Sequence, residues 1–406
     1  MVFGQSCAVK FLSTTPLIQG DGTFTCLVRP FSQLYMFHAL LENGVIYPVL
    51  YCLVSRKNEE TYRRLLLLVE KIARDKGTTI LNRPVRLMVD FELAFIRAAS
   101  QYAAGEQILC CFFHLTKNLK KRAKPILDGV KKAAGEESDE MEMATRTKRA
   151  LMMLPLVPEE LLTTSVVDLV VARWDSAFPE RRGLFDKLRR HIVRNYVGPN
   201  ARFPRHIWSV SGRATRTTNA AESSHAVLNA SVRVRGAVSL DMFLFAIEKQ
   251  MLNVSREIAA GCESHSRAIY RRRNELLAVE LAELLNGSIG IFKFLDRCAS
   301  VVTLKNNDQV GAFLHHRTLE PVDWADKLWA RFNRQAVVQA AVALHARLCP
   351  GVQRSVGEIL ATVPFWAFQV DPCQSDLAVI QENSTLSMTQ TQPRPFFEIR
   401  QELSRQ

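Results

Sequence analysis

Three acidic side chains stand beside predicted strand ends and helix starts, where a sheet can bring them together. Asp21 lies between two glycines after a predicted strand, Asp90 follows the predicted strand at 85–89, and Glu222 falls in the first turn of a predicted helix. Carboxylate oxygens are the ligands that Mg²⁺ and Mn²⁺ prefer, and two such ions can stabilise the attacking and leaving oxygens of a phosphodiester. The three acids therefore predict a two-metal site for phosphodiester cleavage.

Each acid also has an ordinary structural interpretation. An aspartate beside glycine, as at Asp21, is typical of a turn. Asp90 can cap the helix predicted to begin near residue 92. Glu222 completes a capping box with Asn219. The joint placement of the acids on the first strand, the fourth strand and a late helix favours the metal site over three unrelated turns and caps.

The elements that must position the acids follow an α/β order in the first 115 residues. The sequence predicts strands at 15–19, 34–41, 45–54, 85–89 and 108–113, and helices at 58–76 and 92–104. Strands first and helices between the later strands are typical of an α/β sheet. The first and fourth strands can be neighbours in such a sheet, which would bring Asp21 and Asp90 to one edge.

Helical periodicity dominates from His114 onward. A charged, exposed linker is expected at 135–140 and a loop at 198–211. Helices are predicted at 151–171, 181–196, 219–233 and 240–285, and the segment from Gln374, which is rich in Gln, Ser and Thr, is expected to be a loose tail.

The composition is that of a soluble globular protein of two to three domains. The chain has 406 residues, 48% apolar and 23% charged, with no apolar run long enough to span a membrane and no secretory signal. Its nine cysteines are scattered. This pattern argues against a secreted disulfide scaffold and favours a reducing compartment, the nucleus or the cytosol.

The positive charge is concentrated in the middle of the chain. The net charge is +13, and the segment Cys110–Arg273 holds 29 Lys and Arg against 17 Asp and Glu. Phosphate backbones are the commonest partners of such a field, because each neutralised phosphate releases counterions. The alternative is that basic, solvated helices only keep the protein soluble.

Basic and polar residues around Glu222 are candidate DNA contacts. Arg213 and Arg216 precede the predicted helix that carries it. His225 and Asn229 share the helix face of Glu222, at i+3 and i+7, where they could grip a scissile phosphate. A polar stripe on a helix is otherwise simply solvated.

A basic run lies further upstream, within a predicted helix. Lys117, Lys120 and Lys121 can contact phosphate or form part of a nuclear-import signal, and a solvated helix face is the alternative. Cys111 and His114 precede this run. They can contribute to a metal site or a DNA contact, but a buried strand cysteine followed by a helix-start histidine is the simpler interpretation.

Several segments, taken in order, resemble the transposase domain of Mutator-like elements (MULE). They are Asp21-Gly-Thr-Phe, Phe31-Ser-Gln-Leu-Tyr-Met-Phe-His38, Tyr47-Pro-Val-Leu-Tyr-Cys-Leu-Val-Ser-Arg-Lys57, Asp90-Phe-Glu-Leu-Ala94 and Cys111-Phe-Phe-His114-Leu-Thr-Lys-Asn118, and the resemblance resumes at 216–229. Overall it covers about residues 16–254.

The resemblance implies a ribonuclease-H-like mixed sheet with a large all-helical insertion and a helical C-terminal region. It places a catalytic and metal-binding Asp-Asp-Glu triad on Asp21, Asp90 and Glu222. In such enzymes two Mg²⁺ or Mn²⁺ ions support cleavage and strand transfer of duplex DNA at transposon ends, by water and then by a freed 3′-hydroxyl. The expected location is the nucleus, the expected partners are DNA and a second copy of the chain, and no membrane is involved.

The resemblance also divides the chain. We expect the first part of the core at 1–115, the helical insertion at 116–215, completion of the core at 216–260, a helical C-terminal region at 261–373 and the tail at 374–406.

Two departures leave a second function open. Relatives carry a zinc-containing recognition module before the core, whereas about fourteen residues precede the first predicted strand here, and Thr25 stands where relatives have lysine. The alternative is a domesticated, transposase-derived protein that binds or regulates DNA without catalysis.

Overall fold

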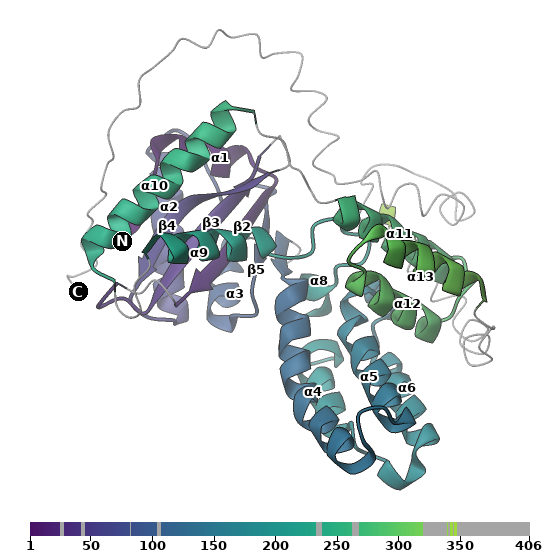
Figure 1. The fold of residues 1–406 in the computed structure, drawn as a ribbon. Helices are drawn as coiled ribbons and strands as arrows, with labels where there is room; N and C mark the ends of the chain where they lie inside the picture. Colours follow the sequence, from purple (N-terminus) through teal and green to yellow (C-terminus); the bar gives the residue numbers. More distant parts are fainter. Residues whose placement is uncertain are drawn as a thin grey trace. The chain divides into compact units, whose positions relative to one another are not determined.

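A computed structural model describes residues 1–319, apart from 25–27, 42–44, 82, 104–106, 233–237 and 262–267, together with residues 339, 342, 343, 345 and 346. The described residues form two units (Figure 1). The described residues of the sheet unit lie within Met1–Cys111 and Thr217–Ser264, and those of the helical unit lie within Phe112–Arg216 and residues 268–346. The tail expected at 374–406 lies outside the described residues.

The described strands of the sheet unit form one mixed, six-stranded sheet. Its order is β1-β4-β3-β2-β5-β6. Neighbours are antiparallel from β1 to β2, whereas β2, β5 and β6 run parallel. The strands are β1 (Val2–Gly4), β2 (Leu17–Thr23), β3 (Gln33–Leu40), β4 (Ile46–Val54), β5 (Arg86–Val89) and β6 (Ile108–Cys110). The predicted α/β sheet is thus confirmed, and the first and fourth predicted strands, β2 and β5, are neighbours.

Helices cover both faces of this sheet. Tyr35 of β3 stacks on Phe95 of α3 (Leu93–Ala99) and contacts Tyr62 of α2 (Glu59–Arg74), with ring centroids 4.7 and 5.7 Å apart. Side chains alternate along a strand, so Leu34 and Met36 point to the other face. There they join a buried cluster with residues of α9 (Asn219–Val232) and α10 (Leu240–Ala259). The α1 helix (Ser6–Thr14) packs on β4 and α2.

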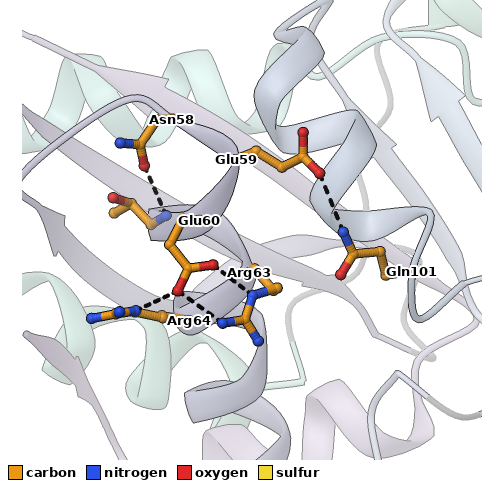
Figure 2. Close-up of polar contacts among 7 residues, drawn as sticks. Asn58, Glu59, Glu60, Arg63, Arg64 and Gln101 are labelled. Carbon is orange, nitrogen blue, oxygen red and sulfur yellow. Dashed lines mark hydrogen bonds and ion pairs between the residues drawn. The ribbon is translucent and has the colours of Figure 1, made fainter.

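The α2 helix shows how local sequence starts an element of this unit. The Asn58 side chain accepts a hydrogen bond from the backbone of Thr61, and Glu60 pairs with Arg63 and Arg64 at 2.7 Å each (Figure 2). Exposed pairs of this kind are screened by water and contribute little to stability. The buried, apolar face of α2 therefore contributes more to its stability than these charges do.

The helices of the helical unit pack around α5. Within it, α5 packs on α4, α6 and α12, and α11 packs on α12. The buried Arg297 of α12 pairs with Glu280 and Glu283 of α11, at 3.2 and 2.9 Å. The helices are α4 (Phe112–Ala134), α5 (Asp139–Met152), α6 (Thr164–Ala177), α7 (Asp186–Ile192), α8 (Arg205–Trp208), α11 (Ala268–Leu285), α12 (Ile291–Thr303) and α13 (Asn307–Leu319).

The predicted linker at 135–140 is wrong at its last two residues, which are helical. The α5 helix begins at Asp139, because the Ser138 side chain accepts a hydrogen bond from the backbone of Met141. Acidic residues in the first turn, among them Glu140, also interact favourably with the positive end of the helix dipole. The charged run at 135–140 therefore contains the start of a helix.

Two predicted helices are interrupted. The segment 151–171 contains Pro155 and Pro158, and the structure has short 3-10 turns there before α6 begins at Thr164. The segment 240–285 is divided between α10 and α11, and Gly261 after α10 has φ +64°, a conformation that ends helices. Among the described residues, no helix is both long and apolar enough to cross a membrane.

Candidate active site

The strand register brings the first two acids level with each other. Leu17 of β2 pairs with Arg86 of the parallel β5, and Gln19 pairs with Met88. Continued by two residues, this register sets Asp21 beside Asp90. The sequence predicts Asp21 after the strand, and this is wrong. Asp21 lies within β2, because β2 continues to pair with β3 through Thr23.

The glycines beside Asp21 make room for side chains of β3. A Cβ at Gly20 would lie 2.6 Å from the hydroxyl of Tyr35, and one at Gly22 would lie 1.5 Å from Nε2 of Gln33. These two side chains cross β2 on the face opposite to that of Asp21, since neighbouring residues of a strand alternate. The glycines on either side of Asp21 therefore let two side chains of β3 pack closely on the backbone of β2, and they do not form the turn that Asp-Gly usually marks.

Gly22→Ala is expected to destabilise the sheet unit by about 1–3 kcal/mol, because the new methyl group displaces Gln33, which accepts a hydrogen bond from Tyr62 at 2.8 Å. Gly129→Ala on α4 is the matched control, since its Cβ would meet nothing within 4 Å. That change should stabilise the protein by up to about 1 kcal/mol. Urea unfolding of the two variants measures the difference, and equal stabilities would contradict the close crossing.

The α9 helix lies over the face of the sheet that carries Asp21. Nδ1 of His225 is 3.6 Å from Oδ2 of Asp21, and the two side chains are only 9% and 6% exposed. Glu222 is one turn earlier on the same helix, so it lies on the same side as His225. The structure thus places the helix of the third acid over the first acid, with Glu222 half-buried.

Three hydrogen bonds hold the start of α9 on the sheet. Gln19, two residues before Asp21, donates from Nε2 to the carbonyl oxygen of Thr217 at 3.1 Å. The backbone N–H and the hydroxyl of Thr218 both donate to Sγ of Cys111, which follows β6, at 3.3 Å. The position of Glu222 therefore depends on two buried side chains, Gln19 and Cys111, that the sequence did not identify as positioning residues.

The middle of α9 is tied to α10 and β4. Gln250 of α10 donates to the carbonyl oxygen of Ser224 at 3.1 Å and accepts from the hydroxyl of Tyr51 at 3.0 Å. His38 of β3 lies beside His225, with ring centroids 6.4 Å apart. Burial, and then the neighbouring His225, lowers the pKa of His38 to about 3, so that ring is neutral at physiological pH.

The pKa values of Asp90 and of two neighbouring groups, Glu92 and Tyr35, are raised, first of all by burial. Burial raises the pKa of Asp90, against a hydrogen bond from the backbone of Glu92 (2.9 Å) and the charge of Lys57. Burial, and then Asp90 among other groups, also raises the pKa of Glu92. The pKa of Tyr35 is raised well above its usual value by burial and then by Asp90, with Asp21 contributing. A cation at this position would relieve the repulsion.

Lys57 is a basic residue near the acids that sequence reasoning did not single out. Its ammonium group lies 3.5 Å from the ring centroid of Phe24, which is half exposed. It also lowers the pKa values of both Asp90 and Glu92. The only sequence signal was its place at the end of the segment 47–57 that resembles the MULE domain.

The carboxylate groups of this site are of the chemical type that binds a hard divalent cation. Carboxylate oxygens are what Mg²⁺ and Mn²⁺ take, and the half-buried Asp90 has a raised pKa, so a cation beside it would stabilise its ionised form. In the part of the chain that the structure describes, however, no three His, Cys, Asp or Glu side chains converge closely enough to hold one ion. The register of β2 and β5, continued by two residues, sets Asp21 level with Asp90, but among the described residues Glu222 does not complete a three-ligand cluster with them.

The remaining predicted DNA contacts are divided between the units. His225 is buried against Asp21, and Asn229 is half-buried on α9. In the helical unit Arg213 and Arg216 line a cavity, and Arg216 donates to the carbonyl oxygen of Arg213 at 3.1 Å. The three predicted lysines all lie exposed on α4, namely Lys117, Lys120 and Lys121.

Comparison with known proteins identifies the part of the chain that holds the first two acids. Residues 17–118 match the family model of the MULE transposase domain. No curated protein matches the chain, and no solved structure does. The matched segment runs from the start of β2 to the first turns of α4 and includes Asp21 and Asp90, while Glu222 lies beyond it. The chain therefore carries a domain of the MULE transposase family over residues 17–118.

Proposed function

We propose that this chain is the catalytic core of a MULE-type transposase, which cleaves duplex DNA and transfers the strand with an Asp-Asp-Glu triad. The observation that carries the proposal is the register of β2 and β5, which sets Asp21 level with Asp90 on a sheet face covered by the Glu222 helix. The match of residues 17–118 to the MULE domain supports the same function.

The topology supports the finer fold assignment, a ribonuclease-H-like core with a helical insertion. Three antiparallel strands, β4, β3 and β2, are followed in the sheet by parallel β5 and β6. The chain then passes through α4 to α8 before it returns to the sheet unit with α9. An insertion between the second and third acids is what the family resemblance implies.

The proposed chemistry uses two Mg²⁺ or Mn²⁺ ions, which supply charge stabilisation of the scissile phosphate and an acidified water when bound. Asp21 and Asp90 would hold them from adjacent strands, and Glu222 would join from α9. His225 orients the Asp21 carboxylate, and Gln19 keeps the start of α9 against β2.

Metal-dependent nicking of a supercoiled plasmid by the purified chain tests this function. We expect nicked product with Mg²⁺ or Mn²⁺ and none with EDTA. Asp21→Asn should remove the activity. Activity that persists in EDTA would contradict a metal-dependent mechanism.

A second candidate is a domesticated, transposase-derived protein that binds DNA in the nucleus without cutting it. The observation that favours it is that Glu222 does not complete a three-ligand cluster among the described residues. Duplex binding by a wild-type protein that nicks with neither Mg²⁺ nor Mn²⁺ would decide for this candidate. Assembly into a homo-oligomer at transposon ends is part of the first proposal, and sedimentation with and without duplex tests it.

Duplex binding is expected to depend strongly on salt. If six or more phosphates are contacted, affinity should fall roughly a thousand-fold between 50 and 200 mM salt. Replacing the exposed Lys117, Lys120 and Lys121 with alanine should weaken binding to unrelated sequences alike and flatten the slope by up to about three units. Fluorescence anisotropy at several salt concentrations measures the slope. An unchanged slope would show that this face of α4 is only solvated.

A further inference from the structure

The carboxyl ends of three strands meet at one edge of the sheet. β2 and β4 both pair antiparallel with β3, so they run in the same direction, and β5 runs parallel to β2. Phe24 directly follows β2, Lys57 lies three residues after β4, and Asp90 directly follows β5. A DNA strand that reaches the acids at this edge therefore comes close to Phe24 and Lys57.

Phe24 and Lys57 form an exposed pair at this edge. The ammonium group of Lys57 lies 3.5 Å from the centroid of the Phe24 ring, and Phe24 is still 48% exposed. Asn58, which caps α2, fixes the backbone directly after Lys57 (Figure 2). An aromatic ring attracts an ammonium group without neutralising its charge. The ring and the helix start together therefore restrict where this positive charge can lie.

The charge of Lys57 reaches the acids. Burial raises the pKa values of Asp90 and Glu92, and the charge of Lys57 acts against both shifts. Two cations that follow on α2, Arg63 and Arg64, each pair with one glutamate of the same helix at 2.7 Å. Lys57 instead lies over a neutral ring and is exposed, so its N–H groups can still donate to the oxygen atoms of a ligand.

A phosphate of the DNA strand is the ligand that suits Lys57. A lysine is a compact charge with three donors and binds phosphate as a point charge. The alternative is that Lys57 only offsets the negative charge of Asp90 and Glu92, but water screens an exposed charge and makes that role small. β4 lies two strands from β2 in the sheet, so Lys57 lies to one side of the acids and would meet a phosphate beside the scissile one.

We propose that Lys57 binds the phosphate next to the scissile one, and that Phe24 is a positioning residue that holds the ammonium group of Lys57 in place. The inference rests on the proposed function, because this phosphate belongs to the strand that the acids would cleave. It adds to that function a contact that determines where the strand enters the site.

Binding of a fluorescent duplex to the full chain, measured by anisotropy with Ca²⁺ in place of Mg²⁺, tests the contact without any need for catalysis. Lys57→Gln should weaken binding about five- to ten-fold at 100 mM salt and reduce the salt slope by about one unit, because one phosphate contact is lost. Lys57→Arg should bind as the wild type does, since a guanidinium group keeps the charge and also lies over aromatic rings. Lys71→Gln removes the same charge from an exposed position on the order of 18 Å further along α2 and should change nothing. Equal binding by the Lys57→Gln and Lys71→Gln variants would overturn the proposal.

A double-mutant cycle tests the role of Phe24. Phe24→Leu should weaken duplex binding about two- to five-fold by itself, because the ammonium group is no longer held over a ring. In the Lys57→Gln background the same change should add nothing, since the ring acts only through that group. An undiminished further loss in that background would overturn the positioning role of Phe24.

Nicking of a plasmid separates this contact from the proposed function. Lys57→Gln should raise the DNA concentration needed for half-saturation more than it lowers the rate at saturating DNA. A chain that shows the expected differences in binding but nicks no plasmid would contradict the proposed function and leave the phosphate contact standing. A chain that nicks while all the variants bind duplex alike would overturn the contact and leave the proposed function standing.

Discussion

Asp90→Asn is expected to reduce metal-dependent nicking at least about a thousand-fold. The amide keeps the shape of the side chain but loses the charge that holds a divalent cation, and charge stabilisation by such ions amounts to about 4 kcal/mol or more. Initial rates on supercoiled plasmid in Mn²⁺ measure the loss. Unchanged nicking by the purified variant would contradict the catalytic assignment of Asp90.

The same variant should fold at least as stably as the wild type at pH 7 in the absence of metal. The pKa of Asp90 is raised by burial, so the folded state prefers its protonated form. Protonated Asp90 stabilises the folded state fully below its unfolded pKa of about 4. This contribution is lost as the pH rises through the higher pKa of Asp90 in the folded state. At neutral pH the ionised carboxylate is destabilising and asparagine is not. Urea unfolding at pH 7 and at pH 3 should show the advantage of the variant at pH 7 only.

Gln19→Leu is expected to lower the nicking rate by about a hundred-fold while leaving the affinity for duplex nearly unchanged. Gln19 is buried and donates to the carbonyl oxygen of Thr217, so its loss leaves that oxygen unpaired and loosens the start of α9. Displacement of a catalytic group by about 1 Å costs on the order of a hundred-fold. The variant should have a lower nicking rate at saturating DNA, whereas the DNA concentration needed for half-saturation should stay the same.

Asn58→Ala is the matched control for Gln19→Leu. Asn58 caps α2, in the same unit, and its removal also deletes a hydrogen bond to the backbone, at a cost of about 1 kcal/mol. Its nicking rate should stay at the wild-type level, because α2 carries none of the three acids. Equal losses of activity in the two variants would show that general destabilisation, and not the position of α9, controls the rate.

The sheet and the place of two acids could be predicted because their signals are local. The apolar segments that form β3, β4 and β5 are long enough to be identified as strands from the sequence, and Asp90 directly follows β5. β1 and α1 were missed because three residues give no period and a nine-residue helix gives a weak one. The glycines on either side of Asp21 predict a turn, so the sequence pattern ends the strand before Asp21. Only the crossing side chains of Tyr35 and Gln33, on another strand, explain those glycines.

The supports of the site could not be predicted, because they join residues far apart in sequence. Gln19 and Thr217 are 198 residues apart, and Cys111 and Thr218 are 107 apart. A single glutamine or cysteine carries no sign of such a partner. The burial of His225 against Asp21 also depends on how α9 packs on the sheet, and a helix-face pattern alone gives only the neighbours within α9.

The binding of Mn²⁺ tests the central claim most directly, since it asks whether the three acids act as one site. Electron paramagnetic resonance of free Mn²⁺, titrated with the full chain, should show two ions bound to the wild type. Asp21→Asn, Asp90→Asn and Glu222→Gln should each weaken binding of at least one ion, whereas Glu257→Gln, elsewhere in the sheet unit, should not. If all three variants bind Mn²⁺ as the wild type does, the triad does not form a metal site.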